Sequence, residues 1–339
     1  MRFSLRLNND LMLPEYVALA LAAEAAGFDQ FWVSNDLFLR SAPVILAAVA
    51  GATSRIEIGS CILNPYTIHP CEIAMLAATL DELSGCRFNL GLAAGAADFL
   101  GWVGLPQTRP LAEMRATILG IRAMLRGERG PLPGPFAPWT EDAYLRFAAP
   151  RVTPIYLGAM SPGMLRLAGE LADGALPLLF PPEHYFGVRP YIEDGIAARD
   201  ASLGQLDLAA CIWVSLDEDR AAAHHALAQK VAYYGHTLSP LILERLGLTH
   251  ADFAPIERAL MAERDQPKAL ALVDERMLAI GVVGTARDVI ARIEPLVRAD
   301  ARHISFGPPL GPDPLAAVRL LGRAVLPHFL DGRPTTEDE

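Results

Sequence analysis

The sequence predicts a closed (β/α)8 barrel, the TIM-barrel fold, built as a single domain. Short apolar segments alternate with amphipathic helical segments along most of the 339 residues. Eight of the apolar segments have the length and continuous hydrophobicity of parallel strands that are covered on both faces. An open doubly wound sheet is the alternative. Such a sheet typically has a glycine-rich turn after its first strand, but the stretch at this position, "RLNNDLMLP", contains no glycine. The closed barrel is therefore the better prediction.

Four strand–helix units are expected in the first part of the chain. Pro14 begins the first helix, and Gly27 and Gly85 lie where the first and third helices end, as is usual for these residue types. The predicted strands are 2–7, 30–36, 56–63 and 87–95, and the helices that follow them are 14–28, 42–54, 70–85 and 111–127.

Four further units are expected in the second part, after an interruption at 128–150. That stretch holds five prolines and is predicted to lie over the barrel, because the alternation resumes after it. The barrel domain is expected to cover 1–330, with 128–150 and about 230–270 as insertions and 331–339 as a disordered tail. The predicted strands are 154–159, 174–180, 206–216 and 303–309, and the helical segments are 161–174, 182–201, 217–297 (broken near 283–285) and 313–327.

Composition limits the possible partners. Hydrophobic residues make up 52% of the chain, and the formal net charge is −10, which argues against nucleic acid and anionic membrane surfaces. The N-terminus lacks a signal-peptide core, and the apolar stretches are too short to span a bilayer. The cysteines show no C-x-x-C or zinc spacing, so we expect free thiols, no metal, and a soluble cytoplasmic protein. They are Cys61, Cys71, Cys86 and Cys211.

Polar residues that follow the predicted strands are the first candidates for chemistry, because barrel active sites lie at the carboxyl ends of the strands. Asp36 ends the second strand beside Ser34 and Asn35, and Asp98 follows the fourth strand. Either carboxylate is a candidate for proton transfer, with a turn or helix-cap role as the alternative. His69 is a candidate acid, base or phosphate contact, and a solvated histidine at a helix start is the alternative.

The loop after the fifth strand is a candidate anion site. Gly158, Ala159, Met160 and Ser161 lead directly into a helix, so small residues and the positive end of the helix dipole meet at one point. The alternative is an ordinary serine N-cap, with Pro162 at the first helical position. The position of the loop at the strand ends makes a phosphate site competitive with that alternative.

Several longer segments, in consistent order, resemble one known group of proteins. They include "RIEIGSCILNPYTIHPCEIAMLAATLDELSGCRFNLGLAAG" (55–95), "PIYLGAMSPGMLRLAGELADGALPLLFPPEHY" (154–185) and "GVVGTARDVIARI" (281–293). A fourth segment, "HISFGPPLGPDPLAAVRLLGRAVLP" (303–327), completes the likeness. The chain resembles the bacterial luciferase-like superfamily of (β/α)8 oxidoreductases. Within it, the resemblance is to the deazaflavin-dependent branch typified by methylenetetrahydromethanopterin reductase.

The resemblance implies a flavin or 5-deazaflavin ring across the barrel mouth. It implies a cis peptide bond behind that ring at Cys61-Ile62, or one bond to either side, and a rim from Asn64 to His69 that includes Thr67. Asp36 matches the polar residue that the family has after strand two. The residues expected to hold the cofactor phosphate, mainly through backbone amides, are Gly158, Ala159 and Met160, with help from Leu179 and Phe180.

Two positions depart from the deazaflavin-dependent pattern. Leu37 follows Asp36 where many relatives have histidine, and Ile68 stands where relatives often have arginine. These departures concern the contacts to cofactor and substrate.

The resemblance implies hydride transfer between coenzyme F420 and a small organic substrate. The alternative on the same scaffold is an FMN-dependent monooxygenase that takes reduced flavin from a separate reductase. A non-catalytic barrel without a cofactor is a third possibility. The resemblance also implies a homodimer formed through helices near strands two and three.

Overall fold

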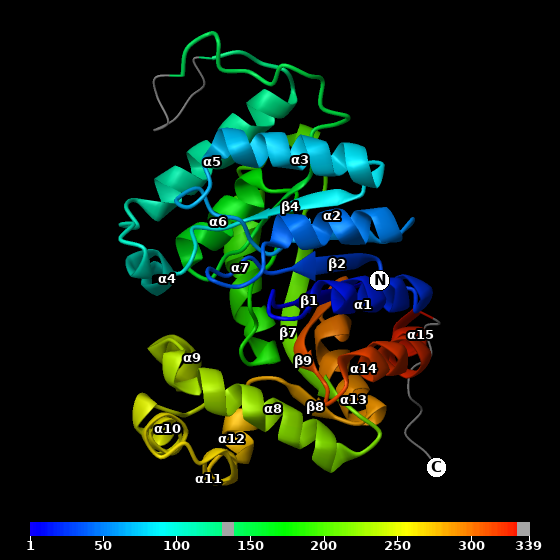
Figure 1. Ribbon diagram of the computed structural model, residues 1–339, viewed down its shortest axis with the longest axis vertical. Helices are drawn as coiled ribbons and strands as arrows, with labels where there is room; N and C mark the ends of the chain where they lie inside the picture. The colour runs from blue at the N-terminus through cyan, green and yellow to red at the C-terminus, as the bar shows by residue number, and fades with distance from the viewer. Residues whose placement is uncertain (131–138, 331–339) are drawn as a thin grey trace.

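Eight parallel strands form a closed ring, which confirms the predicted (β/α)8 barrel (Figure 1). The computed structural model describes residues 1–130 and 139–330, so the predicted tail 331–339 and residues 131–138 of the first insertion lie outside the described residues. The ring is β1 (Arg2–Leu7), β2 (Gln30–Val33), β3 (Glu57–Ser60), β4 (Phe88–Leu92), β5 (Ile155–Leu157), β6 (Gly174–Ala175), β7 (Asp207–Leu216) and β9 (His303–Leu310).

Helices follow most strands and cover the outside of the ring, as expected for parallel pairing (Figure 1). The longer covering helices are α1 (Leu13–Ala25), α2 (Ala42–Ala52), α3 (Pro70–Ser84), α5 (Pro110–Leu125), α6 (Pro162–Leu171), α7 (Tyr185–Ile196), α13 (Ala286–Arg298) and α14 (Pro314–Leu320). Two shorter helices are α4 (Ala97–Trp102), in a loop where no helix was predicted, and α15 (Leu326–Leu330). No helix in the described part of the chain is both long and apolar enough to cross a bilayer.

The predicted sixth strand is shorter than expected. Regular pairing covers only Gly174 and Ala175, and one further bridge joins Leu178 to Cys211. Pro177 lies between these two sections and has no amide hydrogen, so the hydrogen-bond ladder cannot run through it.

The predicted helical region 217–297 is a set of short helices and an additional strand. The helices α8 (Arg220–Tyr234), α9 (Pro240–Arg245), α10 (His250–Glu257), α11 (Gln266–Ala271) and α12 (Glu275–Leu278) lie together beside the barrel (Figure 1). The strand β8 (Val282–Gly284) falls at the predicted break and pairs with the last residues of β7. The helices have a core of their own, which includes Leu227, Leu243 and Phe253 and packs on Trp213 of β7.

Strand alternation sends two different sets of side chains to the two faces of β1. Phe3 and Leu5 belong to the apolar core between the barrel and its helices. Ser4 instead contacts His303 inside the ring. Because side chains alternate along a strand, Arg2 and Arg6 share the inner face with Ser4. The sequence "RFSLRL" therefore places two cations inside the barrel.

A tryptophan fills the middle of the barrel. Trp32 is fully buried, and its ring lies 4.9 Å from that of Tyr156, measured between centroids. Gly59 on the neighbouring strand leaves the space, since a Cβ there would lie 2.2 Å from the Trp32 ring. Trp32 therefore packs the interior and is not available to stack on a bound ring.

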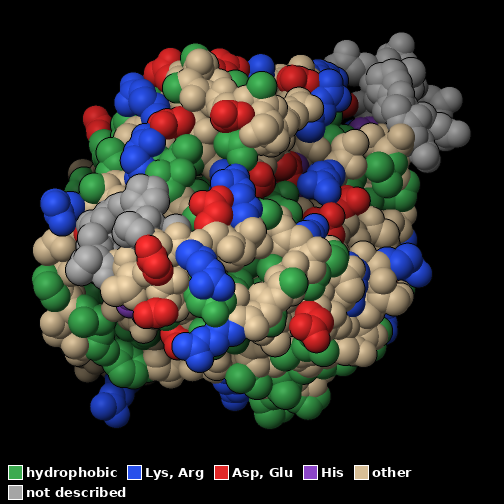
Figure 2. All heavy atoms as spheres, turned by 90° about the horizontal axis from the view of Figure 1, so that it is seen from above, with side chains coloured by type: hydrophobic (Ala, Val, Ile, Leu, Met, Phe, Trp, Pro, Cys, Tyr) green, Lys and Arg blue, Asp and Glu red, His purple; other side chains and the backbone are tan. Residues whose placement is uncertain are grey.

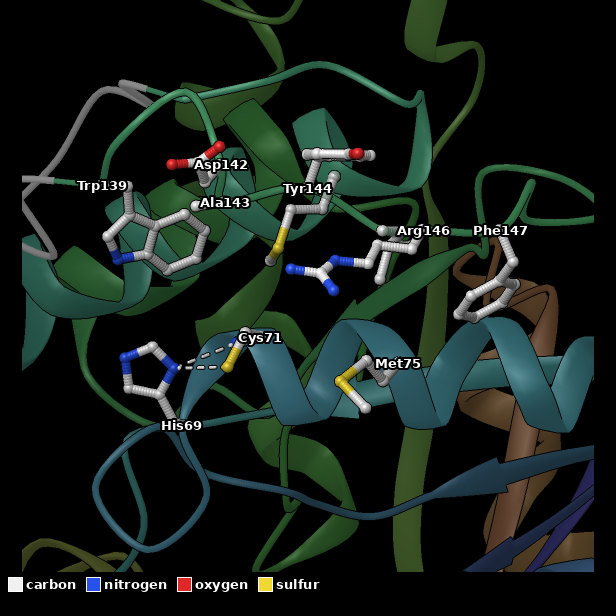
Figure 3. A pocket seen from close by; sticks show the side chains of 11 residues that line it. His69, Cys71, Met75, Trp139, Asp142, Ala143, Tyr144, Arg146 and Phe147 are labelled. Carbon is white, nitrogen blue, oxygen red and sulfur yellow. Dashed lines mark hydrogen bonds between the residues drawn. The ribbon is translucent and has the colours of Figure 1, made fainter.

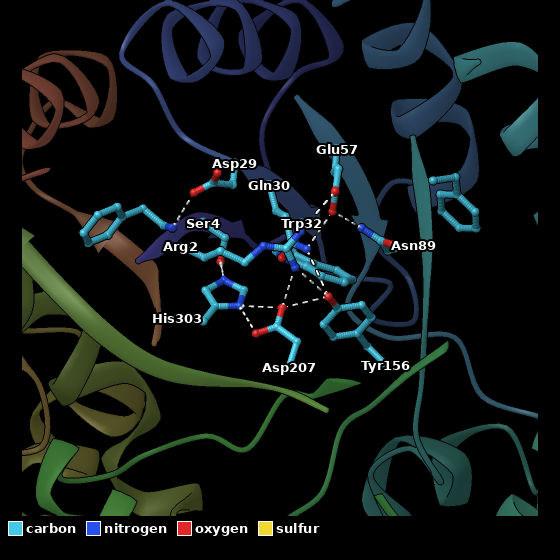
Figure 4. A network of polar contacts seen from close by, with 12 residues as sticks. Arg2, Ser4, Asp29, Gln30, Trp32, Glu57, Asn89, Tyr156, Asp207 and His303 are labelled. Atoms are coloured by element: carbon cyan, nitrogen blue, oxygen red, sulfur yellow. Dashed lines mark hydrogen bonds and ion pairs between the residues drawn. The ribbon is translucent and has the colours of Figure 1, made fainter. Parts of the chain in front are cut away.

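A network of charged and polar side chains closes the amino-terminal end of the barrel (Figure 4). Asp207 Oδ2 accepts hydrogen bonds from Arg2 at 2.9 Å and from the Tyr156 hydroxyl at 2.8 Å, and it lies 3.0 Å from His303 Nδ1. Burial alone would raise the pKa of Asp207, but the charges of His303 and Arg2 and these hydrogen bonds outweigh it and hold that pKa well below its usual range.

Glu57 extends the network to the next strands. Its carboxylate accepts hydrogen bonds from Gln30 and Asn89, each at 2.8 Å, and from Arg2 at 3.3 Å. Residues from β1, β2, β3, β4, β5, β7 and β9 thus meet in one cluster. The cluster ties distant strands together at this end of the barrel.

The face seen from above in Figure 1 carries charges of both signs. Figure 2 shows acidic and basic side chains interspersed there, with apolar side chains between them. Neither sign of charge covers the part of this face whose side chains are coloured in Figure 2.

We predict that Asp207→Asn lowers the free energy of unfolding by about 3 kcal/mol at neutral pH, because it leaves Arg2 and His303 without their carboxylate. The pKa of Asp207 is lower in the folded protein than in the unfolded chain. Its contribution is therefore present above the unfolded value near 3.8 and is lost as the pH falls further. Urea unfolding at several pH values measures both effects, and the variant should be less sensitive to acid.

Asp194→Asn is the matched control, because its partner Arg166 and the carboxylate itself are both largely exposed. It should change the free energy of unfolding by less than about 1 kcal/mol. Equal losses in the two variants would show that the network does not stabilise the barrel.

Candidate functional site

A buried asparagine fixes the first two loops at the barrel mouth. Asn9 follows β1, and its Nδ2 donates to the carbonyl oxygens of Asp36 at 3.0 Å and Arg40 at 2.7 Å. Its Oδ1 accepts from the Asp36 amide at 3.2 Å. Asn9 is fully buried, so these bonds hold the loop after β2 in one position.

Asp36 lies in this loop with a perturbed pKa. Burial, followed by repulsion from Asp10, raises the pKa of the Asp36 carboxyl, and Lys230 opposes the rise. Of its predicted neighbours, Asn35 accepts a hydrogen bond from the Ala42 amide at 3.1 Å near the start of α2, and the Ser34 amide bonds to β1. Of Ser34, Asn35 and Asp36, only Asp36 is charged, and its carboxylate interacts electrostatically with Asp10 and Lys230.

Lys230 of α8 supplies a cation that the sequence did not single out. Its Nζ lies 4.7 Å from the centroid of the Trp213 ring and 4.6 Å from that of Tyr234. Burial lowers the pKa of Lys230 to about 8, against the attraction of Asp10 and Asp36. In residues 1–130 and 139–330, no carboxylate lies within ion-pair distance of it.

Arg6 of β1 is a second cation that the sequence did not single out. It is 6% exposed and lies against Gly307, where a Cβ would be 2.5 Å from Arg6 Nη2. Its charge acts on the thiols of Cys61 and Cys211 and on Lys230. Burial raises the pKa of Cys61 to about 12 despite Arg6, so this thiol stays protonated at neutral pH.

The end of β3 adopts the backbone form that the resemblance implies. The Cys61-Ile62 peptide bond is cis. Gly158 at the end of β5 lies beside it, since a Cβ on Gly158 would be 3.2 Å from Ile62 Cγ2 and 3.2 Å from Ala93 Cβ. Two of the predicted cofactor elements, 61–62 and 158–160, are therefore neighbours.

The segment 64–67 forms a turn held by one side chain. Asn64 Oδ1 accepts from the amides of Tyr66 at 3.1 Å and Thr67 at 3.0 Å, and from the Thr67 hydroxyl at 3.1 Å. Asn64 is buried, and Thr67 is half-buried at the rim. The carbonyl of the Asn64 amide is thus used within the turn.

The start of α6 offers free donors. Ser161 caps the helix by accepting from the Met164 amide at 3.4 Å, which agrees with the ordinary N-cap role. In the described part of the chain, the amide groups of Ala159 and Met160 have no protein hydrogen-bond partner. Ala159 is buried, whereas Met160 is 45% exposed. The free amides, the half-buried Gly158 and the helix dipole suit an anion.

Leu179 and Phe180 are less available. The Leu179 amide donates to the Cys211 carbonyl at 2.8 Å, so this donor is already engaged. Both side chains are buried, and the Phe180 ring packs on Trp213 with 4.5 Å between centroids. Both side chains therefore serve packing, whereas the Phe180 amide has no protein acceptor in the described part of the chain.

Asp98 and His69 make no described contact with Asp36, although α4, which carries Asp98, touches the Asp36 loop through Trp102 and Phe38, whose rings lie 6.3 Å apart. Asp98 is exposed in the first turn of α4. His69 caps α3, with Nδ1 2.9 Å from Cys71 Sγ, and its ring lies 5.8 Å from Trp139. His69, Cys71 and Trp139 line an outer cavity of about 480 Å3 between α3 and residues 139–147 (Figure 3).

The predicted site residues therefore separate into groups. The structure brings Asp36, the 61–62 bond and the 158–160 loop to the carboxyl ends of the strands, where barrel enzymes bind their ligands. Asp98 and His69 are not joined to Asp36 by any described contact. No group of three metal-binding side chains occurs within residues 1–130 and 139–330.

A closed parallel barrel with charged groups at its carboxyl end is the architecture of a barrel enzyme. A family model described as luciferase-like monooxygenase matches residues 3–303. The chain belongs to this luciferase-like monooxygenase family.

Individual relatives match almost the whole chain. The 5,10-methylenetetrahydromethanopterin reductase of Archaeoglobus fulgidus is 31% identical, over 97% of this chain and 100% of that protein. The F420-dependent glucose-6-phosphate dehydrogenase of Nakamurella multipartita is 29% identical, over 97% and 96%. The solved structure of the coenzyme F420-dependent tetrahydromethanopterin reductase of Methanopyrus kandleri has a TM-score of 0.86 at 29% identity, covering 97% of this chain and 99% of that one.

We predict that Lys230 loses its proton with a midpoint near pH 8, because its ammonium is buried between Trp213 and Tyr234. The sequence contains two lysines, Lys230 and Lys268, so protein labelled with [13C]lysine gives two Cε signals to follow by NMR. Lys268→Arg assigns them.

Asp36→Asn should move the Lys230 midpoint further down, since the variant removes an attracting charge. A midpoint at the ordinary lysine value near 10.5, or no response to Asp36→Asn, would contradict the described electrostatics.

Proposed function

We propose that this protein is a coenzyme F420-dependent oxidoreductase that transfers a hydride between the deazaflavin and a small organic substrate at the barrel mouth. The observation that carries the proposal is the similarity, over nearly the full length of both chains, to methylenetetrahydromethanopterin reductase and to a coenzyme F420-dependent tetrahydromethanopterin reductase.

The residues present fit such a cofactor. The free amides of Ala159 and Met160 at the positive end of α6 would hold its phosphate. Gly158 lacks the Cβ that would crowd Ile62, so the backbone there is open to close approach. When bound, the cofactor supplies the hydride-transfer chemistry itself.

The chain would supply orientation and proton handling. Asp36 is held by Asn9, and its raised pKa brings the carboxyl closer to the pH at which it can both hold and release a proton. Lys230 attracts the ionised form and so limits that rise. We infer that Asp36 moves the proton that accompanies the hydride.

Binding of the cofactor is the direct test. Fluorescence titration of the purified protein with coenzyme F420 and with FMN should show tight binding of F420. Tight binding of FMN alone would contradict the proposal and favour a flavin monooxygenase. Binding of neither would favour a non-catalytic barrel.

A homodimer is also proposed, through the helices near β2 and β3. Large apolar side chains are exposed on three helices that pack side by side, with Leu21 on α1, Val44 on α2, and Met75 and Leu83 on α3. Exposed apolar side chains on adjacent helices support association with a second copy. The four free cysteines support a reducing, cytoplasmic location.

We predict that Met160→Glu weakens F420 binding by about tenfold, because a carboxylate beside the free amides repels the cofactor phosphate. Met160→Gln has nearly the same size without the charge and should leave the dissociation constant within about a factor of two. Fluorescence titration measures both. Equal effects of the two variants would show that no anion is held at the start of α6.

A further inference from the structure

Arg6 is a buried cation that lacks an anionic partner. The guanidinium stays ionised at every physiological pH. Its Nε has no hydrogen-bond partner, and Nη2 donates to the Ile212 carbonyl at 3.4 Å, which is long. Its other described hydrogen-bond partner is the Cys211 thiol, which carries no charge to balance the guanidinium. Among residues 1–130 and 139–330, no carboxylate pairs with it.

This arrangement contrasts with the other buried arginine of the described residues. Arg122 is 4% exposed, and its Nη2 lies 2.6 Å from the Asp173 carboxylate. Removing a charge from water without a partner costs several kcal/mol, so proteins pair such groups. The fold nevertheless provides the space for the Arg6 guanidinium by placing Gly307 against it.

A second cation lies on the same part of β7, since Arg6 bonds to the Ile212 carbonyl and Lys230 packs on the ring of the next residue, Trp213. Lys230 lies within range of the Arg6 charge, and the effect of Arg6 is to lower the pKa of Lys230. Lys230 contacts the faces of Trp213 and Tyr234, whereas Asp10 and Asp36 remain beyond ion-pair distance. Two cations that repel each other at a barrel mouth define a place for an anion.

We propose that the substrate carries a carboxylate or another oxyanion that binds between Arg6 and Lys230. The fork of N–H donors on Arg6 matches two oxygens of such a group, and the Lys230 ammonium adds a second charge. The anion would supply the partner that Arg6 lacks and would hold the substrate at the carboxyl end of β1. This inference rests on the proposed function, since it assigns the substrate class of the same site.

The test uses the complete protein saturated with F420 and three variants. Arg6→Met removes the charge at similar volume, and Arg6→Lys keeps a charge without the fork. Arg302→Met removes one charge from an exposed side chain at the opposite end of the barrel and is the matched control. Thermal unfolding is followed with sodium acetate and with sodium phosphate, at an ionic strength held constant with sodium chloride.

The wild type and Arg302→Met should show the same rise in unfolding temperature with acetate or phosphate, because an anion that binds the folded state stabilises it. Arg6→Met should weaken the apparent anion affinity by about tenfold or more, and Arg6→Lys should lie between them. Arg6→Met without added anion should unfold at the wild-type temperature or above it.

Three results would overturn the inference. The first is an anion effect that is equal in Arg6→Met and wild type, or absent from both. The second is a large loss of stability in Arg6→Met without added anion, which would make Arg6 structural. The third is a tenfold loss of F420 affinity in Arg6→Met with no change in the anion effect, which would assign the guanidinium to the cofactor.

The proposed function fails separately. If the wild type does not bind F420 but its anion effect depends on Arg6, the oxyanion site stands and the cofactor assignment falls. If F420 binds and the anion effect is the same in Arg6→Met and wild type, the cofactor assignment stands and the oxyanion site falls.

Discussion

Burial of charge inside a closed parallel barrel is the constraint on which the rest of this structure depends. An inward-facing charged group without a partner is costly, because burial removes the water that solvates it in the unfolded chain. At the amino-terminal end, Asp207 and Glu57 meet Arg2, Tyr156 and neighbouring polar side chains, and this end is closed. The network also fixes which strands lie opposite one another.

At the carboxyl end of the barrel, charged groups among the described residues are removed from water without ionic partners. Arg6 and Lys230 are both largely removed from water, yet neither has a carboxylate within ion-pair distance in the described part of the chain. Asp36 has a raised pKa and is held by Asn9. Unpaired charges such as those of Arg6 and Lys230 can bind a charged ligand. The paired charges around Asp207 at the amino-terminal end instead stabilise the folded barrel.

Much of the fold follows from the sequence, because buried parallel strands are continuous apolar runs and the turns between units carry proline or glycine. The cis bond at Cys61-Ile62 was expected from the resemblance alone, because local propensity does not reveal it, whereas Gly158 was already indicated by the small residues that precede a helix. The early end of β6 at Pro177 was readable but was missed. The division of 217–297 into short helices depends on packing against Trp213, which local pattern does not reveal.

The site was predicted less completely than the fold. Asp36 was found because it follows a strand directly, whereas Lys230 lies in a helix of a weakly matched insertion and gave no such signal. Arg6 could have been recognised from the sequence, since a charge at an alternate position of "RFSLRL" must face either the core or the interior of the ring. Its lack of a partner is a property of the tertiary structure alone, because the groups that could pair with it are distant in sequence.

The most direct test of this account is a crystal structure with coenzyme F420 bound. The account predicts that the deazaflavin ring lies against the Cys61-Ile62 peptide and that the phosphate accepts hydrogen bonds from the amides of Ala159 and Met160. Density for the ring in the outer cavity beside His69 and Trp139, with the barrel mouth empty, would contradict it.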